Sequence, residues 1–416
     1  MSKEPKKAAL LFIFITVLID VIGLGIIIPV VPSLIMELTG EGVSEAARYG
    51  GWLMFVYALT QFIFAPIVGS LSDRFGRRPV LLLSLVGFGI DYIITGLAPT
   101  IVFLFGARIV AGITGASITT ASAYIADVST PEKKSQNFGL IGAAFGLGFI
   151  NGPVIGGFLG EIGPRVPFFA AAGLTFINVL YGYFILPESL PIEKRRPFDL
   201  SRANPLGSLK QLRKFPAVTG LVGVFFLIYL ANHATQSTWA YYTMEKFSWD
   251  EGMVGISLGV VGFSVAIVQG GLTRVVIPKI GEIKSVYLGL IAYIIGFLAF
   301  AFSPNGTILL AVVFPFALGG FAGPALRGII SNEVADNQQG ELQGALTSMM
   351  SFTAIIGPPL MTFLFSYFSG QDADIYFPGA PFVMASILTF IALLLSVKAM
   401  KRHRHHSTAS GMAKSN

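Results

Sequence analysis

The sequence predicts an all-α integral membrane protein with 12 transmembrane helices in two six-helix halves. Three observations predict it: an apolar composition, twelve apolar runs of membrane-spanning length, and a glycine, proline and charge pattern that occurs twice. Of the 416 residues, 54% are hydrophobic and 12% are charged, whereas a soluble domain carries about 25% charged residues. Most of the surface is therefore expected to face lipid.

Each half supplies six apolar runs, and about 20 apolar residues are needed to span a bilayer. The first run is longer than the apolar part of a signal peptide and has no obvious small-residue cleavage site, so we expect it to remain as the first span. The runs lie at 8–35, 51–71, 79–98, 101–126, 137–160 and 167–186, and then at 216–243, 252–276, 285–303, 307–332, 343–368 and 379–399.

The basic residues alternate between the two membrane faces. Nearly all of the 28 lysines and arginines lie on the side of the N-terminus, and only Arg48, Arg165 and Lys246 fall on the opposite side. Because basic residues concentrate in cytoplasmic loops, both termini are predicted to be cytoplasmic, in the inner or plasma membrane. A miscounted span would disrupt this alternation, so the charges also support twelve spans.

A repeat and a basic segment divide the chain. The spacing from Gly139 to Gly152-Pro153 recurs from Gly344 to Gly357-Pro358. Two parallel halves with a solute site between them are a known transporter plan, although chance spacing in a glycine-rich chain is the alternative. The predicted domains are an N-terminal six-helix half (1–190), a cytoplasmic linker (191–215), a C-terminal six-helix half (216–400) and a cytoplasmic tail (401–416).

The absence of certain residues and motifs from the sequence argues against several classes of function. There is no cysteine, and three of the four histidines lie in the tail, so neither a metal site nor a thiol nucleophile is expected. We find no nucleotide-binding Gly-Lys loop and no catalytic triad, so an enzyme or an ATP-driven pump is disfavoured. The net charge of +6 is explained by the membrane orientation and does not indicate nucleic acid. No cofactor is expected, and an ion gradient would supply the energy.

Three ionisable residues fall inside predicted spans. Asp20 and Asp91 each lie about 12 residues into a span, or roughly 18 Å deep, and Arg108 lies roughly 10 Å into the fourth. A charge inside a bilayer is costly and usually functional. Burial favours the neutral form of a carboxylate and a nearby arginine favours the charged form. We therefore predict that Asp20, Asp91 and Arg108 form a proton-coupling site. The alternative for each is a satisfied interhelical hydrogen bond.

The loop between spans 2 and 3 is dense in charge and glycine, and reads Gly69-Ser-Leu-Ser-Asp73-Arg74-Phe-Gly76-Arg77-Arg78-Pro79. This segment resembles the cytoplasmic signature of the major facilitator superfamily. The resemblance implies that the loop latches the two halves, and Asp127 at the end of span 4 joins it in the family pattern. The alternative is that the basic residues of this loop only anchor it on the cytoplasmic face and have no gating role. The predicted gate residues are Gly69, Asp73, Arg74, Gly76, Arg77, Arg78 and Asp127.

Span 5 contains a second glycine-rich pattern. Glycines one turn apart allow close helix approach, and a proline bends a helix. The pattern is similar to the signature of the superfamily's antiporters, with a plain packing seam as the alternative. It consists of Gly148, Gly152, Pro153, Gly156 and Gly157.

Nearly the whole chain resembles the bacterial tetracycline/proton antiporters and their relatives. The quoted similarity lies in span 1 from Asp20 to Pro32, at Asp91-Tyr92, in span 4, and at Pro187-Glu188-Ser189 after span 6. It implies a proton-coupled exporter of amphipathic small molecules that works by alternating access. This chain departs from the family where the best-studied exporters carry a His in span 8 and an Asp in span 9. Val265 and Tyr293 stand there, which indicates a different coupling arrangement.

The second half offers fewer polar candidates. His233 suits proton exchange but is equally a hydrogen-bonding core residue, and Arg327 could pair with Glu333 or extend to the interface. The predicted substrate-cavity residues are Gln61, Asn232, His233, Gln236, Trp239 and Gln269.

A transporter is the function class that these observations favour. The expected partners are a small-molecule substrate, protons and the lipid bilayer, and one chain holding both halves is expected to work as a monomer. A nutrient or metabolite symporter or uniporter of the same fold is the alternative, and a receptor on a transporter fold is a third. The sequence leaves open the cargo, the transport direction, the stoichiometry, and whether losing the span 8 His and span 9 Asp abolishes tetracycline transport.

Overall fold

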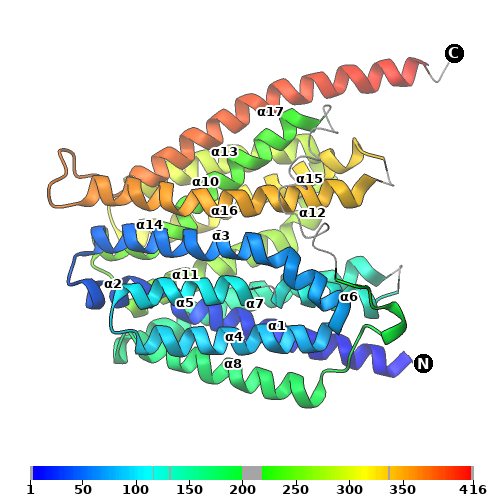
Figure 1. Ribbon diagram of the computed structural model, residues 1–416. Coiled ribbons are helices and arrows are strands. Elements are labelled where there is room, and N and C mark those ends of the chain that lie inside the picture. Colours follow the sequence, from blue (N-terminus) through cyan, green and yellow to red (C-terminus); the bar gives the residue numbers. More distant parts are fainter. Residues whose placement is uncertain (1–2, 116, 131–132, 199–217, 336–337, 414–416) are drawn as a thin grey trace. The chain divides into compact units, whose positions relative to one another are not determined.

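A computed structural model describes residues 3–115, 117–130, 133–198, 218–335 and 338–413. These residues form helices joined by short turns, and no strand occurs among them (Figure 1). The predicted all-α fold is confirmed. Most of the predicted linker, 199–215, lies outside the described residues, as do 414–416 of the predicted tail.

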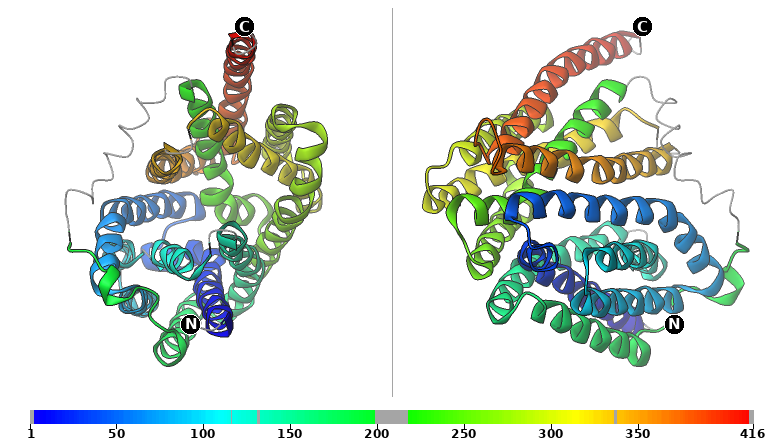
Figure 2. Two further views of the ribbon diagram at one scale, coloured as in Figure 1. Left: turned by 90° about the vertical axis from the view of Figure 1, so that its right-hand side faces the viewer. Right: turned by 60° about the vertical axis from the view of Figure 1, so that its left-hand side comes forward.

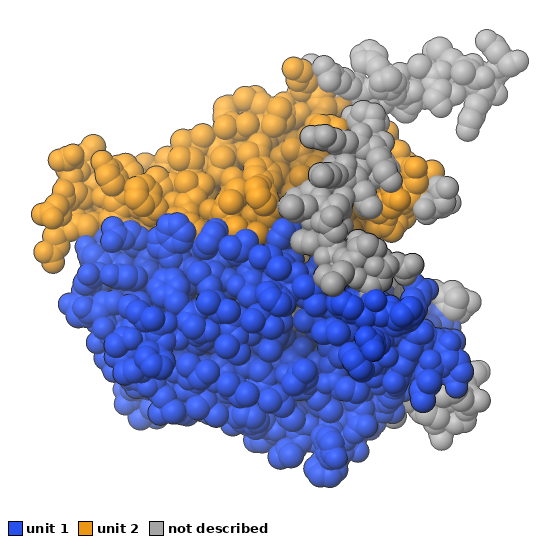
Figure 3. Space-filling model, in the orientation of Figure 1, with its two compact units in different colours: residues 1–205, 240–263 blue, residues 206–239, 264–416 orange. Residues whose placement is uncertain are grey.

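Contacts within the chain group it into two compact units, which Figure 3 colours separately. Unit 1 comprises residues 1–205 and 240–263, and unit 2 comprises 206–239 and 264–416. The division falls inside two helices, because 240–263 contacts the N-terminal residues more than its own neighbours in sequence. The predicted boundary at 191–215 rests on the sequence repeat and stays a prediction.

Unit 1 is built mainly from the first eight helices. These helices run alongside one another in the ribbon views of Figure 1 and Figure 2. Helix α1 packs against α7 and α8, and helix α4 packs against α5 and α8. The helices are α1 (Lys3–Ile27), η1 (Ile28–Val30), α2 (Val31–Thr39), α3 (Val43–Phe75), α4 (Arg77–Leu97), α5 (Ile101–Thr114), α6 (Ser117–Val128), α7 (Lys134–Ile162), α8 (Val166–Ile185) and η3 (Ile192–Lys194).

Unit 2 packs around α13, which contacts α14, α15 and α17. Its main apolar core joins α10, α13, α15, α16 and α17 through side chains such as Phe225, Leu290 and Leu326. The remaining helices of the chain are α10 (Thr219–Phe247), α11 (Glu251–Val265), the π-helix η6 (Ala266–Leu272), α12 (Thr273–Ile280), α13 (Glu282–Phe302), α14 (Gly306–Ala317), η7 (Leu318–Phe321), α15 (Ala322–Asn332), α16 (Gln339–Ser369) and α17 (Ala380–Ala413).

Eleven helical segments within the described residues are long and apolar enough to cross a membrane. They correspond to eleven of the twelve predicted spans, with ends that differ by a few residues or, at 51–71, by up to eight. The twelfth predicted span is α10, whose 29 residues are long enough. It is not among the eleven, and the polar residues Asn232, His233 and Gln236 lie near its middle.

Prolines shape several of these helices without ending them. Pro66 lies inside α3, Pro153 inside α7 and Pro315 inside α14, while α16 contains Pro358-Pro359. Proline removes an intrahelical hydrogen bond and bends the helix, which bilayer proteins tolerate when neighbouring helices cover the freed groups.

Candidate functional site

Asp20 lies on α1 and is almost fully buried, with 3% of its surface exposed. The Ser117 hydroxyl on α6 donates a hydrogen bond to Asp20 Oδ2 over 2.7 Å. No cation pairs with Asp20 in the described residues. This carboxyl group is therefore held by a neutral hydroxyl, inside a helix that is long enough to span a membrane.

Asp91 on α4 forms an ion pair with Arg108 on α5. Only 1% of the Asp91 side chain is exposed, against 17% for Arg108. One carboxyl oxygen of Asp91, Oδ2, accepts the guanidinium, while the other, Oδ1, is buried without a hydrogen-bond partner. The structure thus brings together the two members of the predicted proton site that carry opposite charges.

Neutral polar groups surround these charges. The Gln61 amide on α3 donates to the Tyr57 hydroxyl over 3.1 Å and to the Gly115 carbonyl over 2.7 Å. The buried Tyr92 hydroxyl has no partner, and a Cβ placed on Gly23, three residues after Asp20, would lie 3.6 Å from it. Gln61, which we predicted to line a substrate cavity, ties α3 to α5 beside this cluster.

Arg77 occupies the centre of the predicted gate. At the start of α4, it pairs with Asp73 over 2.6 Å and with Asp127 on α6 over 3.1 Å. It also donates to the Ser72 hydroxyl over 2.6 Å. Two acids from two helices therefore converge on one guanidinium of which 11% is exposed. All of these contacts lie inside unit 1.

Glu188 completes this network and was not among the predicted site residues. Its carboxylate accepts hydrogen bonds from the backbone N–H groups of Arg77 over 2.9 Å and of Arg78 over 3.3 Å. An acid at a helix N-terminus satisfies free N–H groups and interacts favourably with the helix dipole. The only signal was Pro187-Glu188-Ser189 after span 6, since sequence distance hides the contact with α4.

The other predicted gate residues play smaller parts in the network. The Arg74 guanidinium lies 5.1 Å from the centre of the Phe75 ring, and Arg78 donates to the Tyr183 carbonyl. The Gly69 carbonyl accepts from the Ser72 hydroxyl over 2.8 Å. Gly76, at φ +105° and ψ 158°, is the residue that reverses the chain, in a backbone region that only glycine readily adopts.

The predicted antiporter helix packs its glycines against α1. A Cβ on Gly152 would lie 2.8 Å from Cα of Gly25, and one on Gly148 would lie 2.6 Å from the Val21 side chain. On Gly156 it would collide with the backbone of Ile26. Any larger residue at these positions would push α7 away from α1.

Gly157, on another side of α7, faces α11. A Cβ there would lie 3.1 Å from Cα of Gly252 and from Cα of Gly255. Pro153 also faces α1, since its Cδ would lie 2.9 Å from a Cβ on Gly25. The pattern therefore does form a packing seam, and it joins α7 to two neighbouring helices of unit 1.

The predicted cavity residues of the second half occupy different environments. Asn232 donates to the Ile228 carbonyl over 2.8 Å. His233 is buried against Gly357. Trp239 is buried with its ring 5.2 Å from that of Phe300.

Gln236 and Gln269 are exposed side chains. Gln269 sits in the π-helix η6, and a Cβ on Gly320 would lie 3.3 Å from its amide nitrogen. A π-helix is rare and often marks a functional position.

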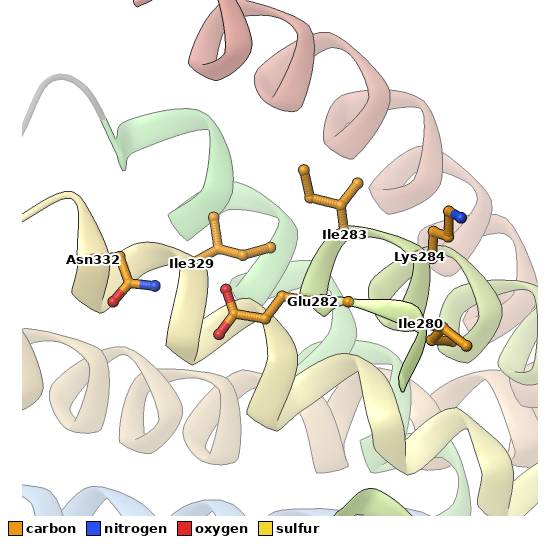
Figure 4. A pocket seen from close by; sticks show the side chains of 7 residues that line it. Ile280, Glu282, Ile283, Lys284, Ile329 and Asn332 are labelled. Carbon is orange, nitrogen blue, oxygen red and sulfur yellow. The ribbon is translucent and has the colours of Figure 1, made fainter. Parts of the chain in front are cut away.

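A pocket of about 330 Å³ opens beside the turn between α12 and α13. Figure 4 shows Glu282 and Asn332 among the side chains around it. It is lined by Ile280, Gly281, Glu282, Ile283, Lys284, Ile329 and Asn332. Within the described residues, no group of three histidine, aspartate or glutamate side chains could hold a metal ion.

Membrane-length helices that bury carboxylates and an ion pair define a membrane transport protein. The family model of the Major Facilitator Superfamily matches residues 13–331 and 279–415. The chain belongs to the Major Facilitator Superfamily, and it is a multi-pass membrane transporter rather than an enzyme.

Curated relatives and solved structures agree with this family. The chain is 40% identical to the class C tetracycline resistance protein of Escherichia coli, over 86% of this chain and 90% of that protein. It is 30% identical to multidrug resistance protein 2 of Bacillus subtilis, over 95% of this chain and 96% of that protein. The crystal structure of the human organic anion transporter MFSD10 shares the fold, with a TM-score of 0.70 at 23% identity over 94% of this chain and 99% of that chain. The resemblance to tetracycline-resistance transporters is confirmed.

Proposed function

We propose that this protein is a proton-coupled exporter of amphipathic small molecules, of the drug or tetracycline-like kind, that works by alternating access. Its relatives support the cargo class. Besides the class C protein, the class E and class B tetracycline resistance proteins are 39% and 36% identical to it over 85% and 92% of the chain. Multidrug resistance protein 2 extends the same support along nearly the whole chain.

The buried carboxylates of unit 1 carry the proposal of proton coupling. Asp20 is held by a neutral hydroxyl and has no cation partner in the described residues, so it can accept a proton without losing an ion pair. Asp91 keeps one oxygen free to take a proton, although protonation there would neutralise its ion pair with Arg108. A charged group in a span is costly, and a transporter that alternates its water access can use that cost. We propose that Asp20 and Asp91 bind the proton.

Arg108 is proposed to tune this site. Its guanidinium stabilises the charged form of Asp91 by direct pairing, whereas Asp20 has no such partner in the described residues. Protonation of either acid changes the net charge of the cluster by one unit. We propose that this change weakens cargo binding or favours the other access state, so that proton entry and cargo release are linked.

The network around Arg77 is proposed to act as the gate. Asp73 at the end of α3, Asp127 on α6 and Glu188 after α8 all hold Arg77 at the start of α4 within unit 1, which supports a latch on the cytoplasmic side. We further propose that both termini are cytoplasmic, that the protein resides in the inner or plasma membrane, and that it works as a monomer.

Two further parts of the proposal concern cargo and motion. Gln61, Asn232, His233, Gln236, Trp239 and Gln269 are proposed to line the substrate cavity. The close contacts of α7 with α1 and α11 support a proposed role for Gly148, Gly152, Pro153, Gly156 and Gly157 in keeping these helices together while the access state changes.

A nutrient or metabolite symporter of the same fold is the second candidate. One observation favours it: Tyr293 stands where the sequence alignment expects an acid in tetracycline exporters. Its ring stacks on Phe297 with 5.8 Å between centres. A phenol in place of a carboxyl group leaves this position of α13 without an acid.

Export can be tested in cells that lack their own drug exporters. Cells expressing this protein should accumulate less tetracycline, or less of another amphipathic drug from a panel, than cells carrying an empty vector. A protonophore should abolish the difference, because it collapses the energy source. Greater accumulation of a compound in the expressing cells would support the importer, and export that persists with the protonophore would contradict proton coupling.

A further inference from the structure

Arg327 is a charged residue of unit 2 that the proposed proton and gate networks do not use. It lies on α15, inside a segment (Gly306–Asn332) long and apolar enough to cross a membrane. Its guanidinium Nη2 donates to the Tyr229 hydroxyl over 3.1 Å and to the Met350 sulfur over 2.9 Å, and its centre lies 5.4 Å from that of the Phe225 ring. These partners come from three different positions on α10 and α16.

No carboxylate neutralises this cation in the described residues. The ion pairs there involve Arg77, Arg108, Arg165 and Arg195. A pair between Arg327 and Glu333, one of the two alternatives from the sequence, is not among them. Arg327 Nε is buried and has no hydrogen-bond partner. A hydroxyl, a thioether and a ring face stabilise a guanidinium, but they leave its charge uncompensated.

Arg108 gives the contrast within the same chain. It also lies in a candidate span, and there Asp91 supplies the missing negative charge. A cation held in a span is usually paired with an acid or marks a path for substrate or ions. Arg327 fits the second description, a residue on a substrate or ion path, because its neighbours hold the guanidinium in place without neutralising its charge.

Gly323 lies four residues before Arg327, and residues four apart share one helix face. Long helical side chains lean toward the N-terminus of their helix, which is the direction of Gly323. A Cβ on Gly323 would meet no atom within 4 Å, so no neighbouring side chain covers this face of α15 at Gly323.

The groups around Arg327 indicate the chemistry of a ligand. The rings of Phe225 and Tyr229 have 4.5 Å between their centres and are tilted by 40° to each other, and Met349 packs beside the same core. The planar guanidinium fork suits a carboxylate or another oxyanion, while rings and thioethers suit an aromatic body. The combination fits an amphipathic organic anion that carries an aromatic ring.

We propose that Arg327, with Tyr229 and Met350, binds the anionic group of an aromatic cargo, so that the transported compounds include organic anions. This inference rests on the proposed function, because it names a class within the proposed amphipathic cargo. It does not involve Asp20 or Asp91, and the two proposals can therefore fail separately.

A matched pair of compounds tests the site. Binding of 1-naphthaleneacetate and of its neutral amide, 1-naphthaleneacetamide, would be measured by calorimetry on the purified full-length protein in detergent. The wild type should bind the acid about tenfold more tightly than the amide, as one charge-assisted hydrogen bond allows. Arg327→Gln should remove this preference and leave amide binding unchanged.

Control variants separate the role of Arg327 from general effects of charge and folding. Arg274→Gln removes a positive charge from an exposed position of the same unit and should keep the preference. Arg327→Lys keeps the charge but loses the fork, and should retain part of the preference. If Arg327→Gln proves unstable, Tyr229→Phe, which removes one partner of the guanidinium, should weaken binding of the acid alone.

A lipid headgroup offers the same anionic chemistry, so a second titration uses a short-chain phosphatidylglycerol. If this lipid and 1-naphthaleneacetate compete for binding to the wild type but not to Arg327→Gln, the anion site binds both compounds. Binding of the lipid that depends on Arg327, without binding of the acid, would overturn the cargo assignment. Equal binding of acid and amide to the wild type, or a preference that survives Arg327→Gln, would overturn the anion site.

The two proposals give different patterns of failure. Proton-driven export of an uncharged or cationic drug without any preference for the acid would refute the anion site and leave the proposed function standing. An Arg327-dependent preference without proton-driven transport of any compound would leave the anion site standing and refute the exporter.

Discussion

The turn at Gly76 and the turn at Gly281 have the same backbone but different surroundings. Gly76 has φ +105° and ψ 158°, Gly281 has φ +84° and ψ 158°, and each precedes a helix of 21 residues. Each glycine N–H also closes the preceding helix, by donating to Ser72 over 3.1 Å and to Ile277 over 2.9 Å. Arg74-Phe75-Gly76 and Lys279-Ile280-Gly281 thus form turns of the same backbone shape.

The two turns differ in the charged contacts around them and in how closely neighbouring side chains pack. At Gly76 the Glu188 carboxylate sits over the start of α4, and Arg77 draws in Asp73 and Asp127. At Gly281 a pocket of about 330 Å³ remains, and Glu282 forms no hydrogen bond or ion pair within the described part of the chain. The same turn therefore forms with a network of ion pairs around it and without one.

Removing the central guanidinium should have the largest effect. Arg77→Gln would leave Asp73 and Asp127 facing each other without a cation, which should lower the free energy of unfolding by about 1–3 kcal/mol, between the values for exposed and buried pairs. If the network is the gate, the initial rate of drug export should fall about tenfold. Export rates in vesicles and thermal midpoints in detergent would measure both effects.

Lys279→Gln is the matched control at the second turn. It removes a basic residue that forms no ion pair within the described residues, so export and thermal midpoint should hardly change. An equal loss of export in the two variants would mean that the first turn has no special role.

Adding a methyl group to each glycine separates backbone strain from crowding. Gly76→Ala and Gly281→Ala both force alanine into a region that costs about 1–3 kcal/mol. At Gly76 the new Cβ would also lie 2.8 Å from Glu188 Cδ, whereas at Gly281 it would meet no atom within 4 Å. Gly76→Ala should therefore lower the thermal midpoint further than Gly281→Ala. Equal shifts would show that Glu188 yields freely and does not hold the turn.

Neutralising the acid over α4 should have the smallest effect of the three. Glu188→Gln keeps a hydrogen-bond acceptor but loses the charge that faces the helix N-terminus, at a cost of about 0.3–1 kcal/mol. Glu282→Gln, in the first turn of α13, is the control and should cost less because its carboxylate holds no backbone N–H group. A larger drop in thermal midpoint for Glu282→Gln than for Glu188→Gln would contradict this explanation.

Much of the fold could be predicted because bilayer spans depend on composition over about 20 residues. Ten of the twelve predicted runs coincide with candidate spans to within four residues at each end, and 51–71 falls inside Val43–Phe75. The break at Pro29 and Pro32, which separates α1 from α2, lies within a single predicted run. Hydropathy cannot detect such a break, since the residues on both sides are equally apolar.

The site could be predicted only where residue type signals function. A charge inside a span pointed to Asp20, Asp91 and Arg108, and the pairing of the last two followed from the fold. Glu188 was missed because it lies 111 positions from Arg77, and Pro187-Glu188-Ser189 indicates the family without indicating a contact with α4. Arg327 was noticed, but its surroundings depend on α10 and α16, which no local pattern connects.

The central claim is that a proton on a buried acid of unit 1 drives export, and Asp20 tests it most directly. The protein would be reconstituted in liposomes with a pH-sensitive dye inside, under an imposed proton gradient, and tetracycline and other drugs would be added to wild type and Asp20→Asn. Our account predicts proton flux that depends on a drug in the wild type and vanishes in Asp20→Asn, although the variant still binds the drug. Full drug-driven proton flux in Asp20→Asn would contradict it.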